Sequence, residues 1–371
     1  MPPFHALLRK WRYGLLLTLI LTLGFVLYSC SMEGGRYTTI ADDRHSAPYI
    51  PAGDISLYVG RHRFPESSLD RRLDFNINGN DVMVFLHMQK TGGTTFGKHL
   101  TRDLDLSSPC ECSKSKKRCN CFRPSSRHQF WLFSRLSTGW MCGLHADWTE
   151  LHACVPDAMD RKEKIKVRRR YFYITVVRNP VNRYISEWRH TQRGATWKSS
   201  RLMCGGREAT EKEIAPCFTS TTWMGVTLKD FMACPSNLAH NRQTRMLADL
   251  TLVGCYNHSG LSTAEYERIL LASAKANLES MAFFGLTDHQ RELQYLFERT
   301  FHMSFRADLM QHNLTIANAS PVQDGELELV KAKNHLDMEL YAFAKDLFFQ
   351  RYKHMKDLER KEAQKTNSPI S

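Results

Sequence analysis

The chain contains three apolar runs, which are separated by segments with a helical pattern. The runs are Val82–Leu86, Tyr171–Val177 and Met281–Leu286. Each has the length and the β-branched or aromatic content of a buried strand. Residues with helical periodicity cover Thr94–Leu104, Val181–Thr191, Ala264–Ser280 and Asp288–Phe301. This alternation predicts an α/β fold with a central parallel sheet flanked by helices.

Two further segments have helical patterns and no strand after them. They are Leu228–Leu250, with Pro235 as a candidate break, and the long charged segment Gly325–Gln364. Upstream, Met32–Arg72 contains Gly, Pro and charge without periodicity, which is typical of a linker or stem. The folded domain is therefore expected to begin between Leu73 and Asp81.

The junction after the first predicted strand has the composition of an anion-binding turn. His87-Met-Gln-Lys90, a Gly92-Gly93 pair and two threonines lead from the strand into a helix. Backbone N–H groups at such a turn and the positive end of the helix attract anions, and Lys90 adds a full charge. Lys90 precedes the glycines, whereas the lysine of a Walker A loop follows them. The turn predicts a phosphate-bearing ligand and argues against ATP held with magnesium.

A second junction follows Tyr171–Val177. Arg178 offers a planar fork for a phosphate, Asn179-Pro180 is a strong helix start, and Ser186 supplies a hydroxyl two turns later. Because ligands bind at the carboxyl ends of parallel strands, the two junctions predict a donor with two separated anionic groups. A nucleotide kinase would instead need an acidic residue after this second strand to help hold magnesium.

The N-terminus has the pattern of a membrane anchor. Gly14–Tyr28 carries no charge and follows Arg9, Lys10 and Arg12. The pattern fits a signal peptide or a short signal anchor, and without a clear cleavage site we favour a type II anchor. We expect a cytoplasmic tail at 1–13, the anchor at 14–30 and a lumenal stem at 31–73.

Cysteine use and glycosylation motifs agree with a lumenal chain. Eleven cysteines are present, of which ten follow Cys30, and an even number favours disulfides. N-glycosylation motifs begin at Asn257, Asn313 and Asn318. The cluster Cys110-x-Cys112 and Cys119-x-Cys121 leaves zinc as an alternative, although that spacing is poor for tetrahedral coordination.

The chain is strongly basic, with a formal net charge of +13. Such a charge favours a polyanionic partner. For a lumenal chain, an acidic glycan is a better interpretation than nucleic acid.

Several long motifs resemble one enzyme family. FLHMQKTGGTTFGKHL, WLFSRLSTGWMCGLHADWTEL, RYISEWRHTQRGATWK and NRQTRMLADLTLVGCYN are similar to the heparan sulfate 6-O-sulfotransferases, from about Asp74 to Lys356. The resemblance implies a P-loop-like sulfotransferase fold over residues 74–356, with 357–371 as a charged tail. It also implies a Golgi membrane protein that transfers sulfate from 3′-phosphoadenylyl sulfate (PAPS) to the 6-hydroxyl of glucosamine in heparan sulfate.

The resemblance also implies the residues that bind the donor. They are His87, Met88, Gln89, Lys90, Thr91, Gly92, Gly93, Thr94 and Thr95 at the first junction, Arg178 and Ser186 at the second, and Met310, Gln311, His312, Ile316 and Ala317 further on. The family often has Arg where this chain has Ile316, which weakens a side-chain contact there. No metal is required, because sulfate carries less charge than phosphate.

Two residues are assigned to catalysis. Lys90 is expected to stabilise the bridging oxygen as charge develops on it. His145, in Gly143-Leu-His-Ala-Asp147, matches the family's general base, with His87 and Glu150 as other candidates.

The acceptor site is expected to combine cations with aromatic rings. By resemblance its residues are Lys117, Arg118, Arg135, Trp140, His145, His190 and Trp197. Trp140 and Trp197 are also compatible with core positions. The alternative function is a noncatalytic lumenal protein that binds heparan sulfate.

Overall fold

The computed structural model describes residues 61–113, 118–257, 260–309 and 322–366. The chain divides into two units, 1–51 and 52–371, and all described residues belong to the second. The predicted anchor and residues 31–60 of the predicted stem lie outside them. None of the described helices is long and apolar enough to span a membrane.

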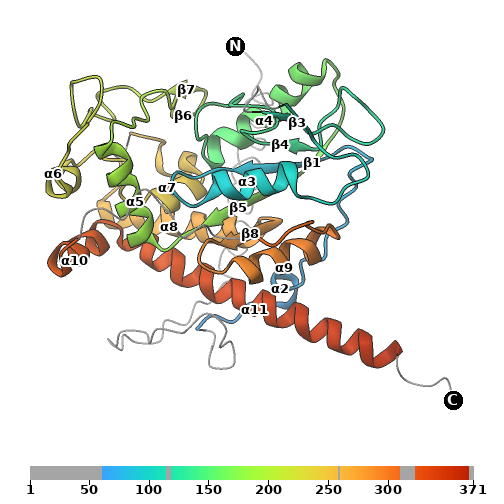
Figure 1. Cartoon of the computed structure of the whole chain (residues 1–371). Helices are drawn as coiled ribbons and strands as arrows, with labels where there is room; N and C mark the ends of the chain where they lie inside the picture. The colour runs from blue at the N-terminus through green and yellow to red at the C-terminus, as the bar shows by residue number, and fades with distance from the viewer. Residues whose placement is uncertain (1–60, 114–117, 258–259, 310–321, 367–371) are drawn as a thin grey trace, which may run out of the picture. The chain divides into compact units, whose positions relative to one another are not determined.

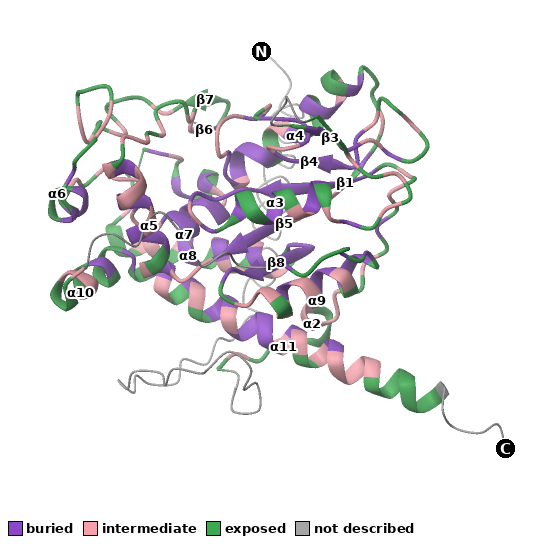
Figure 2. Ribbon diagram, viewed as in Figure 1, coloured by how far each residue is buried: buried purple, intermediate pink, exposed green. Residues whose placement is uncertain are grey.

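A four-stranded parallel sheet forms the centre of the second unit. Its strands are β1 (Asp81–Leu86), β4 (Leu132–Phe133), β5 (Arg170–Val177) and β8 (Phe283–Leu286), in the order β4-β1-β5-β8. Every residue of β1 and β8 is buried, and Figure 2 shows the same for the centre of the sheet. The mostly apolar strands and their parallel pairing confirm the predicted α/β sheet.

Helices pack around this sheet (Figure 1). Their bounds are α2 Glu66–Leu69, α3 Gly93–Arg102, α4 Trp148–Glu163, α5 Pro180–Gln192, α6 Leu228–Ala233, α7 Arg242–Leu247, the 3₁₀ turn η1 Leu250–Val253, α8 Thr263–Ser280, α9 Gln290–Phe301, α10 Asp324–Lys333 and α11 His335–Thr366. The long helix α11 contacts α8, α9 and strand β8, which closes one side of the core.

Two of the predicted helices are shorter than expected. The segment predicted as Leu228–Leu250 is helical only in α6 and α7, and the eight residues between them include Pro235. The predicted final helix is interrupted at Asn334, whose side chain accepts from the Asn241 N–H and donates to the Val330 carbonyl. Both breaks therefore satisfy backbone groups that a continuous helix would have used.

Five disulfides use all ten cysteines after Cys30. They are Cys110–Cys121, Cys112–Cys119, Cys142–Cys154, Cys204–Cys255 and Cys217–Cys234. The disulfide prediction is confirmed. The zinc alternative is wrong, because the four thiols of the Cys-x-Cys cluster are bonded to one another across the ribbon of β2 (Glu111–Cys112) and β3 (Cys119–Asn120). A second ribbon pairs β6 (Met203–Cys204) with β7 (Arg207–Glu208).

Candidate active site

The turn between β1 and α3 is tight and is held by a hydrogen bond from outside it. Lys90 and Gly92 have left-handed φ values of 65° and 84°, and Gly92 precedes the first helical residue. A side chain at Gly93 would place its Cβ 2.3 Å from the His87 ring, so only glycine fits there. Thr287, just after β8, donates a hydrogen bond to the Thr91 carbonyl. The predicted succession of strand, turn and helix is present.

The second junction lies directly beside this turn. Arg178 Nη1 donates to the Lys90 carbonyl at 3.1 Å, across 88 residues of sequence. Gln243 holds the backbone of Arg178 through two hydrogen bonds. Two buried polar atoms, Arg178 Nε and Gln89 Oε1, have no hydrogen-bond partner among the described residues. These two atoms lie at the two predicted junctions.

Aromatic side chains gather at the edge of the turn. The His87 ring stacks on Phe85 and on Trp140, with centroids 5.5 and 5.9 Å away. His145 lies 4.9 Å from His87, 4.7 Å from Trp140 and 5.2 Å from Trp197. Trp140 is 37% exposed, and Trp197 is half-buried. Neither tryptophan belongs to the hydrophobic core of the described residues.

The environment of His145 fixes its tautomer. His145 has a left-handed φ of 54°, and its Nδ1 lies 2.7 Å from the His87 carbonyl. A carbonyl only accepts, so Nδ1 carries the proton and Nε2 is left with a free lone pair. Burial, opposed by that backbone bond and helped by Arg242 and Arg135, lowers the pKa of His145 to about 4. The ring is therefore neutral at neutral pH, with Nε2 unprotonated.

Cations line the same edge. The Arg135 guanidinium lies over the Trp140 ring at 5.5 Å and donates to Thr94 Oγ1. Arg118 packs its guanidinium against Gly139, next to Trp140. Burial, partly offset by Glu187, lowers the pKa of Lys90. His190, whose pKa is lowered by burial and by Lys90, packs 5.6 Å from Trp197.

Glu150, a candidate base on sequence grounds, faces the protein interior. Its two carboxylate oxygens accept the backbone N–H groups of Asp147 and Met203. Together with Asp147 it forms the capping box at the start of α4. Burial, followed by the charge of Asp147, raises the pKa of Glu150 to about 7. Its contacts give it a structural role beside the His145 loop.

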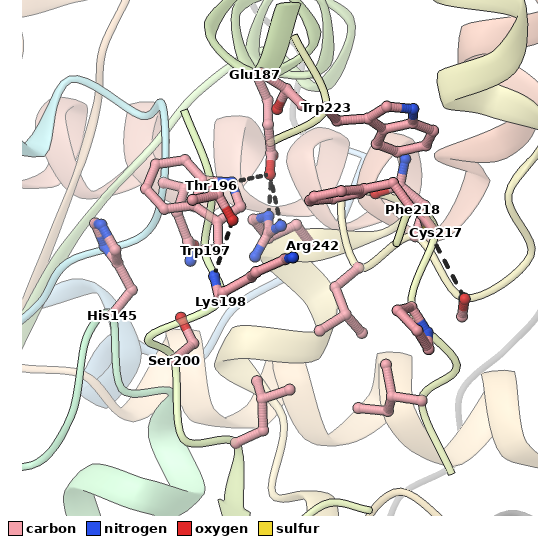
Figure 3. A pocket seen from close by; sticks show the side chains of 18 of the residues that line it. His145, Glu187, Thr196, Trp197, Lys198, Ser200, Cys217, Phe218, Trp223 and Arg242 are labelled. Atoms are coloured by element: carbon pink, nitrogen blue, oxygen red, sulfur yellow. Dashed lines mark hydrogen bonds and ion pairs between the residues drawn. The ribbon is translucent and has the colours of Figure 1, made fainter. Parts of the chain in front are cut away.

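A buried ion cluster behind the site was not predicted from the sequence. Glu187 on α5 accepts hydrogen bonds from Arg242 and the Trp197 indole (Figure 3). It also accepts one from Arg183. Arg183 lies four residues before Glu187 on the same helix, whereas Arg242 and Trp197 lie 55 and 10 residues away in other segments. The available signal was the Arg183–Glu187 pair at positions i and i+4 inside the apolar face of a predicted helix.

Some predicted site residues fall outside the described ranges. They are Lys117, Met310, Gln311, His312, Asn313, Ile316, Ala317 and Asn318. Asn257 is described and exposed, and Ser186 is half-buried on α5. Within the described residues, no group of three or more His, Cys, Asp or Glu side chains is arranged to hold a metal ion.

Comparison with known proteins identifies the family of this chain. The sequence profile of the sulfotransferase family matches residues 73–344. Heparan-sulfate 6-O-sulfotransferase 2 of Gallus gallus is 54% identical over 310 residues, which cover 83% of this chain and 77% of that protein. Heparan-sulfate 6-O-sulfotransferase 3-B of Danio rerio is 56% identical over 304 residues, covering 82% and 72%. Heparan-sulfate 6-O-sulfotransferase 1 of Homo sapiens is 54% identical over 307 residues, covering 82% and 74%. This chain therefore belongs to the sulfotransferase family and, within it, to the heparan-sulfate 6-O-sulfotransferases.

Proposed function

We propose that this protein transfers the sulfuryl group of PAPS to the 6-hydroxyl of glucosamine residues in heparan sulfate. The observation that carries the proposal is the contact between the turn after β1 and a cluster of aromatic side chains. The turn contains Lys90, and the cluster consists of His87, His145, Trp140 and Trp197. The names of the relatives supply the substrate and the position on the sugar.

The donor is assigned to the two junctions. The N–H groups of the turn, Lys90 and the start of α3 face one anionic group of PAPS, and Arg178 and Ser186 the other. Support comes from the unpaired donor Arg178 Nε, which lies at the second junction. The segment 310–317 remains part of the proposed donor site by resemblance alone.

The reaction is an in-line displacement. His145 Nε2 takes the proton of the 6-hydroxyl as that oxygen bonds to sulfur, and the bond from sulfur to the bridging oxygen breaks. Lys90 stabilises the negative charge left on that oxygen. The products are the 6-O-sulfated sugar and adenosine 3′,5′-bisphosphate. Since sulfuryl oxygens carry little charge, we propose that these groups suffice without a metal.

The acceptor chain is assigned to the aromatic edge. Trp140 and Trp197 offer flat faces for sugar rings, and His190 lies beside Trp197. Arg118 and Arg135, with Lys117 by resemblance, offer charges for sulfate and carboxylate groups. These roles rest on position and on the resemblance.

Two variants test the chemistry. Lys90→Ala should lower kcat at saturating PAPS by about 100-fold or more, because stabilisation of the leaving oxygen is lost. His145→Ala should lower kcat by about 100- to 10,000-fold. Both are measured as transfer of labelled sulfate from PAPS to heparan sulfate, with donor binding and folding checked separately. Near-full turnover of Lys90→Ala would refute its role.

The second candidate is a noncatalytic protein that binds heparan sulfate. The net charge of +13 would permit it. It would bind both PAPS and glycan in the assay above and incorporate no label. His145 lies beside the turn that carries Lys90, and its neutral ring has the proton on Nδ1 and a free Nε2. This arrangement favours the catalytic function over the noncatalytic one.

The proposed setting is the Golgi lumen. We propose that residues 1–13 are cytoplasmic, 14–30 cross the membrane and 31–73 form a stem, with the domain at 74–356 and a charged tail at 357–371. The five disulfides support an oxidising compartment. Glycosylation at Asn257, Asn313 or Asn318 would be detected as a mass shift on glycosidase treatment.

A further inference from the structure

A cavity of about 200 Å³ borders His145 and Trp197, two of the residues assigned to the acceptor. Figure 3 shows His145 and Trp197 toward one side of it, and Phe218 and Trp223 toward the other. Its wall is largely apolar, with Ile214, Pro216 and Phe231 among the lining residues. Glu187 and Arg242 form a charged end. Trp197 therefore has empty space rather than close packing along part of its side chain.

The backbone that carries Trp197 is irregular. Residues 193–200 follow the end of α5 and contain no helix or strand. Ser200 ties the segment to the His145 loop by donating from Oγ to the Leu144 carbonyl, and its N–H bonds the Trp197 carbonyl. Neither contact fixes the indole ring itself. A ring that borders a cavity gains few dispersion contacts on that side, so packing alone holds it weakly.

One polar contact does fix the ring. Trp197 Nε1 donates to Glu187 Oε1 at 3.0 Å. Glu187 is 1% exposed and also accepts from Arg242 and Arg183. Burial alone would raise the pKa of Glu187, but Arg242 and Arg183 lower it to about 2. The acceptor of the indole bond is thus a rigid, ionised carboxylate, which makes the bond stronger than one between neutral groups.

We propose that Glu187 is a positioning residue that holds the Trp197 ring against His145 and away from the cavity. The acceptor sugar then meets an aromatic wall already in place, and its hydroxyl meets His145 Nε2 at a fixed distance. Ser186, assigned to PAPS, and Glu187 are adjacent on α5, so one helix contributes to binding of the donor and to positioning of the acceptor. This inference rests on the proposed function, which assigns Trp197 to the acceptor.

Trp197→Phe isolates the hydrogen bond, since it keeps an aromatic ring and removes the donor. The KM for heparan sulfate should rise on the order of tenfold, as expected for one bond to a charged group. The KM for PAPS and the thermal midpoint should change little. Trp223→Phe is the matched control: it lies on the same cavity, and no hydrogen bond joins its indole to another described residue. That control should leave both KM values unchanged.

A double-mutant cycle connects the effect to Glu187. If Glu187→Gln folds, its effect on the acceptor KM should be non-additive with Trp197→Phe, because both change the same hydrogen bond: Gln removes the charge of the acceptor, and Phe removes the donor. If Glu187→Gln is unstable, ¹⁵N-tryptophan spectra of the wild type test whether the Trp197 indole N–H is held in a hydrogen bond. The indole N–H signal that disappears in Trp197→Phe should exchange slowly with solvent.

The outcomes separate the two proposals. An acceptor KM of Trp197→Phe equal to that of the wild type, or a fast-exchanging Trp197 indole, would overturn the positioning role. A wild-type protein that transfers no sulfate would overturn the proposed function, while the exchange measurement would still report on the ring.

Discussion

Lys90 and His145 share an unusual backbone conformation. Both are non-glycine residues with left-handed φ values, 65° and 54°. That conformation costs about 1–3 kcal/mol and persists where the surrounding structure enforces it. At Lys90 the enforcing contacts include the bond from Arg178, and at His145 the bond to the His87 carbonyl. The strain places the two side chains proposed for catalysis at the tips of neighbouring loops.

The charge state of His145 can be measured directly. We expect ¹⁵N NMR of the ring to show a neutral tautomer with the proton on Nδ1 down to about pH 5, because burial lowers its pKa to about 4. The unfolded chain binds this proton more tightly, so His145 stabilises the fold fully above about pH 6.5 and loses that contribution as the pH falls toward 4. The signal is assigned with His145→Ala. Half-protonation near pH 6.5 would contradict the described environment.

Gly93 offers a second test at the residue scale. Gly93→Ala should push the His87 ring away from Trp140 and His145, since the added Cβ would lie 2.3 Å from it. We expect loss of most transfer activity and a destabilisation of about 1–3 kcal/mol. Gly97→Ala, one turn later in α3, is the control. Its Cβ would meet Leu136 at an ordinary 3.4 Å. Equal effects of the two substitutions on turnover would contradict the described turn.

At the scale of elements, three strands and most helices follow from local patterns. β1, β5 and β8 are apolar runs, and α5 has an Asn cap whose side chain accepts from Asn182. β4 was not predicted, because a strand of two residues is too short to show a periodic pattern. α4 was also missed, although Asp147 and Glu150 form a capping box that the sequence displays.

The long-range disulfide should matter more to stability than the short ones. Cys204 and Cys255 are 51 residues apart, whereas Cys112 and Cys119 are 7 apart. Closing the larger loop removes more entropy from the unfolded chain, about 4 against about 2 kcal/mol. We therefore expect the double alanine variant of the first pair to have the lower free energy of unfolding. Urea titration checks this, and the reverse order would contradict it.

For the whole molecule, the candidate site depends on contacts that no single segment reveals. The sheet order β4-β1-β5-β8 brings Arg178 to Lys90, and α7 brings Arg242 to Glu187. The two junctions were predictable, because parallel strands share one functional edge. The Glu187 cluster and the cavity beside it were not, because they depend on the irregular segments between α5 and α7.

The central claim concerns the chemistry of the intact protein. The most direct measurement is disaccharide analysis of heparan sulfate incubated with PAPS and the full chain, with Lys90→Ala and His145→Ala as controls. We predict new sulfate on the 6-hydroxyl of glucosamine, made by the wild type and nearly absent with either variant. Sulfate at another position, or no sulfate although both PAPS and the glycan bind, would contradict the proposed function.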